Sequence, residues 1–492
     1  MKTIVNILTV SLMFLLVSGC KQEYFPPDQL SDEQVRSSPE LLSNLTVGTY
    51  SRLREPNYVR LRHFIQELPG DELLWSKSSG DNLANAYNYN RLVNSASSLN
   101  FWNQAYYGIF QANKVIEAIE DNAPQNKLQL KGENLFLRAL MHYDLIRIFG
   151  RPYSQSPDKN LGVMIKENSA MNDLPGRSTV KETYEFIVKD LLRAAELMKE
   201  NKANVFASKE VAWALLARVY LYMDQNDKAL EYADKVINSG RYKLVTTAQL
   251  SKYYTTSPEA NSETIFAIKY QTSENPGKAS IGSLYTRDGW GEILVTKNYR
   301  QLIYKNPNDE RIKFLDPDYV LDASGNKIPD AIEESGFRVN KAMGYSRYFN
   351  LKYTLQDNVL MLSSPVVLRL AEMYLIKAEA YAKMPGKEGE ALQMVNVIRS
   401  RAGLSAGQLY TIDDLKGYAT VLDVVLAERN LELAWEGHRS FDLFRNNRSL
   451  DRSFTQSEGW SGPRMIEPTS NLIVAYIPEV EINLNPKLIQ NP

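Results

Sequence analysis

Aromatic side chains alternate with amide and charged side chains in two segments, residues 67–100 and residues 285–292. A sugar ring presents C–H groups on its face and hydroxyls around its rim. A protein site for such a ring therefore needs flat aromatic side chains beside amide, carboxylate or guanidinium groups. We predict that the two segments together form one ligand site. Its candidate contacts are Trp75, Tyr87, Tyr89, Tyr285, Arg287 and Trp290.

The glycines around Trp290 favour a tight, exposed loop, because Gly289 and Gly291 tolerate backbone conformations that other residues avoid. A second interpretation stays open, since large aromatic residues often fill the core beneath long loops, and both Trp75 and Trp290 suit that role. A third candidate set comprises Tyr345, Arg347 and Tyr348. Three further tryptophans lie in helical patterns and are predicted to be packing residues: Trp102, Trp213 and Trp435.

Charged residues recur near the end of the chain, but their pattern indicates ion pairs rather than catalysis. Glu428, Glu432 and Glu436 are spaced four apart, which places them on one face of a helix. Arginines lie close to them, as they do to Glu372 and Glu379, so we predict partly buried ion pairs that hold helices in register. A glycosidase pair of carboxylates must face an open cleft, which spacing alone does not establish. We predict no catalytic residue.

The sequence lacks the usual ligand patterns of a metal or nucleotide site. Its three histidines, His63, His142 and His438, lie on separate segments, and no H-x-x-x-H, C-x-x-C or G-x-x-x-x-G-K motif occurs. We therefore predict no metal and no cofactor, although calcium held by surface Asp and Asn groups stays open. The formal net charge of −1 argues against nucleic acid as a partner.

The beginning of the chain has the features of an export signal. An apolar run from Ile4 to Val17 precedes Cys20 and is shorter than the roughly 20 residues that span a bilayer. Small residues before Cys20 suit a signal peptidase. We predict that residues 1–19 are a lipoprotein signal peptide, that Cys20 is the lipidation site, and that residues 20–30 form the lipid anchor and tether. Because Cys20 is the only cysteine, an intrachain disulfide is excluded.

Apolar residues at helical spacing predict pairs of helices over about 102–240 and 367–446. The clearest pair runs from Val211 to Ile237 around a turn at 224–227, and its length is close to that of a tetratricopeptide unit. The individual helices are expected at Trp102–Glu120, Glu133–Phe149, Thr179–Lys199, Val367–Lys383 and Glu388–Ala402.

The segments between these helices, about 67–100 and 243–364, have few helical patterns and are rich in Gly, Pro, Asn and Tyr. Short strands are expected at Thr264–Tyr270 and Leu472–Ile477. A long unstructured loop within a compact body is uncommon, so we predict a packed, ligand-facing region. The predicted fold is mainly α, with tetratricopeptide-like helix pairs packed against a loop-rich, ligand-binding half with minor β. Residues 31–492 are expected to form one body.

Four motifs follow one another along the chain in a fixed order. They are F-L-R-A-L-M-H-Y-D-L-I-R-I-F-G (136–150), V-L-R-L-A-E-M-Y-L-I-K-A-E-A-Y-A (367–382), E-R-N-L-E-L-A-W-E-G-H-R-S-F-D-L-F-R (428–445) and I-P-E-V-E-I-N-L-N-P-K-L-I-Q-N-P (477–492). In this order, and with the lipidation motif at Cys20, they resemble the SusD/RagB family of outer-membrane nutrient-binding lipoproteins. Ser363-Ser364-Pro365 departs from the family, many members of which carry an acidic residue before the proline.

The resemblance implies a non-catalytic lipoprotein, held at the outer membrane by its lipid anchor and exposed at the cell surface. It implies a SusC-like TonB-dependent barrel transporter as partner and an oligomeric nutrient as ligand, usually an oligosaccharide or polysaccharide. Family members place their ligand site on loops from the two general regions that contain Trp75 and Trp290.

Three other functions stay open from the sequence. The ligand is a peptide in some branches of the family, the RagB type. A glycoside hydrolase on the same surface is a second alternative, and a tetratricopeptide-type adaptor for peptides is a third, favoured if exposed apolar helix faces replace the aromatic loops. Arg287 and Lys297 suit an anionic glycan, but Asp288 and Glu292 offset that preference.

Overall fold

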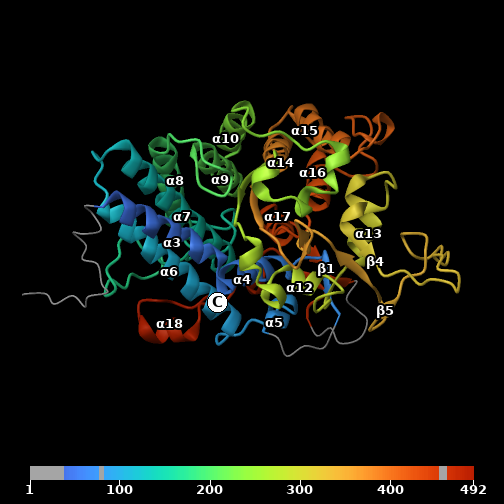
Figure 1. Ribbon diagram of the computed structural model, residues 1–492, viewed down its shortest axis with the longest axis horizontal. Helices are drawn as coiled ribbons and strands as arrows, with labels where there is room; N and C mark the ends of the chain where they lie inside the picture. The colour runs from blue at the N-terminus through green and yellow to red at the C-terminus, as the bar shows by residue number, and fades with distance from the viewer. Residues whose placement is uncertain (1–37, 77–81, 454–461) are drawn as a thin grey trace, which may run out of the picture.

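The computed structural model describes residues 38–76, 82–453 and 462–492 (Figure 1). The predicted signal peptide, the lipidation site Cys20 and Trp460 lie outside the described residues. No helix within the described ranges combines the length and apolar character needed to cross a membrane.

The helices dominate the described chain. The α-helices are α3 (Pro39–Arg54), α4 (Pro56–Glu67), α5 (Leu83–Tyr87), α6 (Ala96–Ala118), α7 (Gln125–Phe149), α8 (Val180–Leu197), α9 (Lys209–Tyr222), α10 (Asn226–Asn238), α11 (Thr247–Leu250), α12 (Gly282–Tyr285), α13 (Lys297–Ile303), α14 (Leu370–Ala382), α15 (Glu388–Arg401), α16 (Val421–Glu432), α17 (Arg439–Arg445) and α18 (Glu479–Leu484). Short 3₁₀ turns are η1 (Tyr253–Thr255), η2 (Pro258–Ala260), η3 (Thr272–Glu274), η4 (Gly277–Ala279), η5 (Glu310–Phe314), η6 (Ala406–Gln408) and η8 (Asn471–Ile473).

The strands are short and pair only in twos. They are β1 (Leu73–Trp75), β2 (Thr264–Ala267), β3 (Ile293–Val295), β4 (Leu315–Pro317), β5 (Lys341–Ala342), β6 (Tyr345–Ser346), β7 (Tyr348–Asn350), β8 (Leu355–Gln356), β9 (Val359–Leu360), β10 (Val366–Arg369), β11 (Leu450–Asp451) and β12 (Met465–Ile466). The antiparallel pairs are β1–β3, β2–β10, β4–β7, β5–β6, β8–β9 and β11–β12.

The expected helix pairs are present. Helices α9 and α10 pack against each other across a turn in which Asp224 has a φ of 57°. Helices α14 and α15 form a second pair across Gly386, whose φ of 76° suits a residue without a side chain. Together with α6, α7 and α8 they form the helical layer in Figure 1. The predicted mainly α fold is confirmed.

Local sequence signals set the ends of several helices. Before α8, the Thr179 hydroxyl accepts a hydrogen bond from the backbone N–H of Glu182 at 3.1 Å. The Glu182 carboxylate in turn accepts one from the backbone N–H of Thr179 at 2.8 Å. This capping box satisfies two N–H groups that the helix itself leaves unpaired. It explains why the helix expected from Thr179 begins at Val180.

Two expected elements are corrected. The helix predicted from Val367 starts at Leu370, because residues 366–369 form β10 and pair with β2. An apolar run of this kind suits a buried strand as well as a helix, and the partner strand decides between them. The strand predicted at Leu472–Ile477 is absent, and residues 471–473 form a 3₁₀ turn. The strand predicted at Thr264–Tyr270 is confirmed as the shorter β2.

Buried ion pairs join the helices at the centre of the molecule. Arg369 pairs with Glu432 at 2.5 Å and with Glu436 at 2.9 Å, while Arg311 pairs with Glu428 at 2.7 Å. All of these side chains are at most 5% exposed. The prediction that these glutamates form structural ion pairs is confirmed. The Glu372 carboxylate pairs with Arg218, and the Glu379 carboxylate with Arg445.

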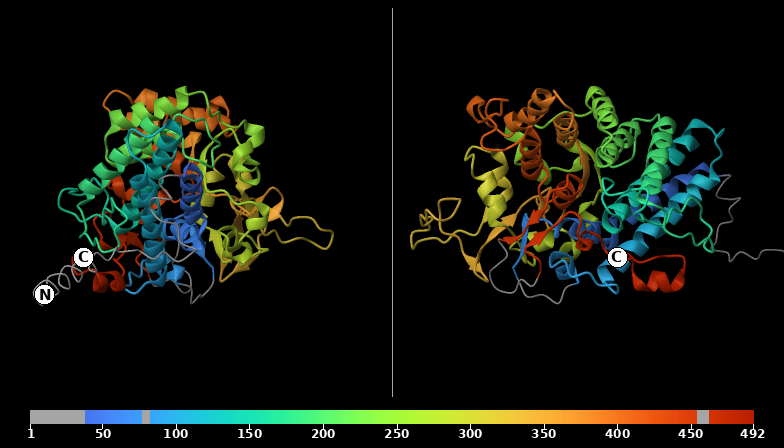
Figure 2. Two further views of the ribbon diagram at one scale, coloured as in Figure 1. Left: turned by 60° about the vertical axis from the view of Figure 1, so that its left-hand side comes forward. Right: turned by 180° about the vertical axis from the view of Figure 1, so that it is seen from behind.

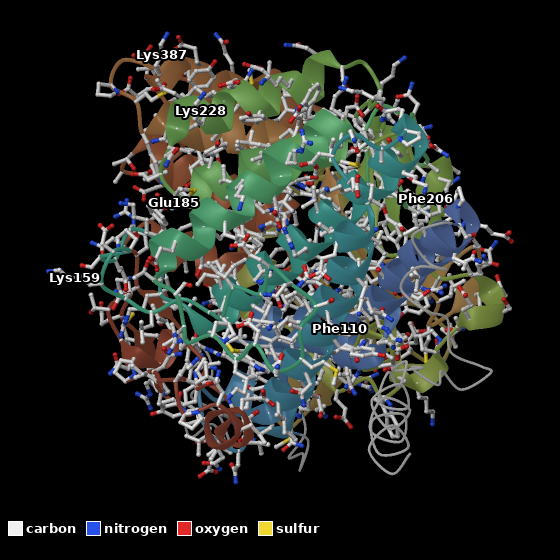
Figure 3. All side chains as sticks on the ribbon, turned by 90° about the vertical axis from the view of Figure 1, so that its left-hand side faces the viewer. Phe110, Lys159, Glu185, Phe206, Lys228 and Lys387 are labelled. Carbon is white, nitrogen blue, oxygen red and sulfur yellow. The ribbon has the colours of Figure 1, made fainter. Side chains whose placement is uncertain are left out.

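The outer side of the helical layer carries charged side chains. Figure 3 shows Lys159, Glu185 and Lys228 pointing into solvent from this side. The apolar face of α8 is turned inward, where Ile187 and Leu191 are fully buried. A helix with one apolar and one charged face buries the apolar one against its neighbours.

Candidate functional site

Strands β1 and β3 bring the two predicted ligand-facing regions together. Trp75 pairs with Ile293 in the strand register. The pairing continues beyond the strands, because the backbone N–H of Ser76 donates to the Glu292 carbonyl at 2.8 Å. At the other end, the backbone N–H of Thr296 donates to the Glu72 carbonyl at 3.0 Å. Residues more than 200 positions apart thus share one small two-stranded sheet.

Trp290 lies on the loop just before β3 and is 46% exposed. The loop is fixed by its backbone, since the N–H of Trp290 donates to the Ser283 carbonyl at 2.6 Å. The indole Nε1 donates to the Lys278 carbonyl at 3.3 Å, and the Lys278 ammonium lies 4.7 Å from the ring centroid. One large aromatic ring is therefore held in place while nearly half of its surface faces solvent.

Arg287 lies on the same loop within a network of opposite charges. Its guanidinium pairs with Asp316 at 2.7 Å and with Asp318 at 3.2 Å, and Arg347 pairs with Asp318 at 2.7 Å. Both arginines lie over the ring of Phe349. The side chains are partly exposed, so their remaining N–H groups and lone pairs can bind hydroxyls. We use the name Trp290 surface for the group formed by Lys278, Arg287, Trp290, Asp316, Asp318 and Arg347.

A cavity of about 290 Å³ lies at the opposite end of β3. It is enclosed by β1, the beginning of α13 and the β5–β6 hairpin, and Tyr345 of the third candidate set lines it. Arg300 pairs with Glu334 there at 2.9 Å, and the Ser346 hydroxyl donates to Glu333 at 2.5 Å. Figure 2 shows the chain between β4 and β5, residues 318–340, projecting from the body beside it. We call this space the hairpin cavity.

Four of the six predicted contacts are buried. Trp75 is 7% exposed, Tyr87 5%, Tyr89 3% and Tyr285 0%. The Tyr285 hydroxyl lies 2.7 Å from Nε2 of His63, and the Tyr89 hydroxyl donates to the Pro69 carbonyl at 2.6 Å. A ligand on the surface has no ring face of these four to stack on, so their assignment is corrected. They are core residues beneath the loops that were predicted to face the ligand.

The remaining two predicted contacts, Arg287 and Trp290, are accessible and lie on one loop. Among the third set, Arg347 belongs to the Trp290 surface and Tyr345 to the hairpin cavity, while Tyr348 is buried. Sequence reasoning did not select Arg300, and its contact with Glu334 arises only when the projecting segment folds back over α13. The sequence did contain a sign that Tyr87 is a core residue, because Tyr87 lies four residues after Leu83 and therefore on the same face of α5. Both side chains are buried.

Two models of known families match this chain. The model described as "SusD family" matches residues 231–492, and the model described as "Starch-binding associating with outer membrane" matches residues 25–221. The chain belongs to the SusD family. Its predicted resemblance is thereby confirmed.

Relatives of this SusD-family chain cover nearly its whole length. The starch-binding protein SusD of Bacteroides thetaiotaomicron is 26% identical over 89% of this chain and 86% of its own. A SusD-like protein, P38, of Formosa agariphila is 24% identical over 90% of this chain and 92% of its own.

Solved structures agree with this SusD-family fold. A SusD-superfamily protein of Bacteroides vulgatus is 29% identical, with a TM-score of 0.79 over 92% of this chain and 99% of its own. A protein of the same species, described as a putative sugar binding protein, is 27% identical with a TM-score of 0.77 over 92% of this chain and 98% of its own.

The three histidines and a group of glutamates of this SusD-family protein are buried inside the fold. Burial alone favours the neutral acid at Glu436, but Arg369 and Lys352 lower its pKa to about 2. Burial lowers the pKa of His63 to about 3, and that of His142 also to about 3. Within the described residues, no group of three or more His, Cys, Asp or Glu side chains is arranged to hold a metal ion.

Proposed function

We propose that this protein is a cell-surface lipoprotein that binds an oligomeric glycan and delivers it to a SusC-like TonB-dependent outer-membrane transporter. The observation that carries the binding role is the exposed Trp290 ring beside Arg287 and its aspartate partners. A ring face of this kind stacks on the C–H face of a sugar, and the charged groups bind its hydroxyls. The names of the starch-binding and sugar-binding relatives support the same ligand class.

The Trp290 surface and the hairpin cavity are proposed as two parts of one extended site. They lie at the two ends of β3, so that residues 290 and 297 are separated by at most about 23 Å of extended chain. A chain of several sugar units can reach from one to the other. In this proposal Arg287 and Trp290 bind one end of the ligand, and Tyr345 lies beside the other.

Measuring the glycan affinity of the Trp290→Ala variant tests this site directly. We expect the variant to lose about 1–3 kcal/mol of glycan affinity, as is usual for an aromatic residue at the centre of a binding surface. Affinity electrophoresis and calorimetry against a panel of soluble polysaccharides measure the change. The matched control is Tyr107→Ala, since Tyr107 is also 46% exposed but lies on α6 of the helical layer. Equal losses in both variants, or in neither, contradict the proposed site.

The lipid anchor is proposed at Cys20, from the lipidation motif and from the outer-membrane association in the name of one matching family. Mass spectrometry of the protein extracted from membranes is expected to show an acylated cysteine as the first residue. Cys20→Ser is expected to release the protein into the soluble fraction. Unmodified Cys20 in membrane-extracted protein contradicts the anchor.

The proposed partner is a barrel transporter, which co-purification from detergent-solubilised outer membranes tests. We expect a TonB-dependent transporter to be recovered with the tagged protein. The hydrolase alternative predicts released oligosaccharides when the purified protein is incubated with the polysaccharides that it binds. The peptide alternative predicts that peptides displace the bound polysaccharide.

A further inference from the structure

A second cleft, of about 540 Å³, lies on the other side of α13 from the hairpin cavity. Helices α13 and α16 form its walls and contact each other, as their neighbouring positions in Figure 1 show. Lys297 and Arg300 of α13 face the hairpin cavity, whereas Asn298 and Gln301 face this cleft. Residues three apart lie on one side of a helix, so each side of α13 serves a different space. We call the space lined by Asn298 and Gln301 the α13 cleft.

The charges that line the α13 cleft are largely paired. Arg439 binds both carboxylate oxygens of Asp71, at 2.8 and 2.9 Å, and Arg448 binds Asp423 at 2.9 Å. Burial raises the pKa of Glu72 well above its ordinary value, which favours its neutral form. The one other cation that lines the cleft, Lys305, is exposed and lies against the Tyr418 ring, so at most one lining charge is left without an opposite partner among the described residues.

Neutral polar groups supply the remaining surface. Asn298 and Gln301 are exposed amides on α13, and Tyr418 offers a half-buried ring whose centroid lies 5.7 Å from the Lys305 ammonium. Asn430 also lines the cleft, and its Oδ1 is buried and accepts no hydrogen bond from any described residue. Amide groups beside an aromatic ring suit a ligand with many hydroxyls and no charge.

We propose that the α13 cleft is a second ligand site of this protein, specific for a neutral oligosaccharide segment. The inference rests on the proposed glycan-binding function but adds a site separate from the Trp290 surface. Asn298, Gln301 and Asn430 bind sugar hydroxyls, and Tyr418 packs against a sugar ring. A polysaccharide that reaches across α13 occupies both sites at the same time, which raises the overall affinity by linking two binding events.

Affinity electrophoresis and calorimetry of the mature chain test this site with named probes. Soluble starch, laminarin and xyloglucan are neutral, and alginate is anionic. The cleft variant carries Asn298→Ala, Gln301→Ala and Tyr418→Ala. A second variant, Ala427→Trp, fills the cleft from α16 without removing any of these groups. Thermal unfolding shows that each variant is folded.

We expect both cleft variants to bind a neutral polysaccharide roughly tenfold more weakly than the wild type. Trp290→Ala alone is expected to retain a neutral ligand at the cleft. Combining Trp290→Ala with the cleft variant is expected to abolish saturable binding. Wild-type affinity in both cleft variants for every neutral probe that binds overturns the second site and leaves the proposed function intact. A wild-type protein that binds none of the polysaccharides overturns the proposed function as well.

Discussion

The carboxyl groups of Glu67 and Glu72 bind alternate backbone amides of one turn. Oε2 of Glu67 accepts a hydrogen bond from the N–H of Gly437 at 2.6 Å, and Oε2 of Glu72 accepts one from the N–H of Trp435 at 3.4 Å. Both carboxyl groups are buried. Trp435 has a φ of 63°, so the turn holds a bulky residue in a left-handed conformation that needs support from its surroundings.

This pair predicts a loss of stability at high pH. Burial raises the pKa of Glu72 well above its ordinary value of 4.5, and the charge of Glu67 adds to the rise. Because the pKa is raised in the folded state, the neutral Glu72 carboxyl contributes its full stabilisation below about pH 4.5. That stabilisation is lost as the pH rises through the pKa of Glu72 in the folded protein. Denaturant unfolding across pH measures it. Glu72→Gln is expected to flatten the decline, and the exposed Glu185→Gln to leave it unchanged.

We expect the loss of one side chain from a buried ion pair to lower the free energy of unfolding strongly. Arg311 binds Asp309, Glu428 and Glu432, all at most 2% exposed. Arg311→Ala leaves buried carboxylates without their partner and is expected to lower the free energy of unfolding by about 3–5 kcal/mol. The matched surface pair is Arg54–Glu274, which is about one third exposed. Arg54→Ala is expected to cost at most about 1 kcal/mol. Similar losses in the two variants contradict this reasoning.

The Trp290 loop depends on the small size of Gly289. A Cβ atom at this position lies 2.3 Å from the Ser283 carbonyl oxygen, which is backbone and cannot rotate away. Gly289→Ala is therefore expected to displace the loop and to lower glycan affinity about tenfold, measured by calorimetry. The control is Gly48→Ala, where a Cβ meets nothing within 4 Å. Unchanged affinity in Gly289→Ala shows that the loop position does not matter for binding.

Trp290 also provides a spectroscopic test of the site. It is 46% exposed, whereas Trp75, Trp102 and Trp435 are at most 7% exposed. A bound glycan is expected to cover the indole and to reduce acrylamide quenching of tryptophan fluorescence. Trp290→Phe is expected to remove this protection while it retains part of the binding. Equal protection in the variant and the wild type places the ligand elsewhere.

The spacing of apolar residues alone was sufficient to predict most helices of the helical layer. The helices expected at Glu133–Phe149 and Glu388–Ala402 correspond to α7 and α15, because apolar residues at helical spacing need only a neighbouring surface to pack on. The same rule failed at Val367, where the apolar run Val366–Leu368 suits either a helix or a strand. The decision depended on β2, a strand about 100 residues earlier in the chain.

The candidate site likewise has features that the sequence predicted and features that only the tertiary structure decided. The sequence by itself determined that residues 285–292 form a tight glycine-bordered loop carrying Arg287 and Trp290, since loop geometry is local. It did not determine which aromatic residues are accessible, because accessibility depends on what other segments cover. Trp75 and Trp290 both lie in segments that were predicted to face the ligand, yet the structure buries Trp75 in β1, which pairs with β3, and leaves Trp290 exposed. Only the tertiary structure, by closing the contacts between segments distant in sequence, separates the buried ring of Trp75 from the exposed ring of Trp290.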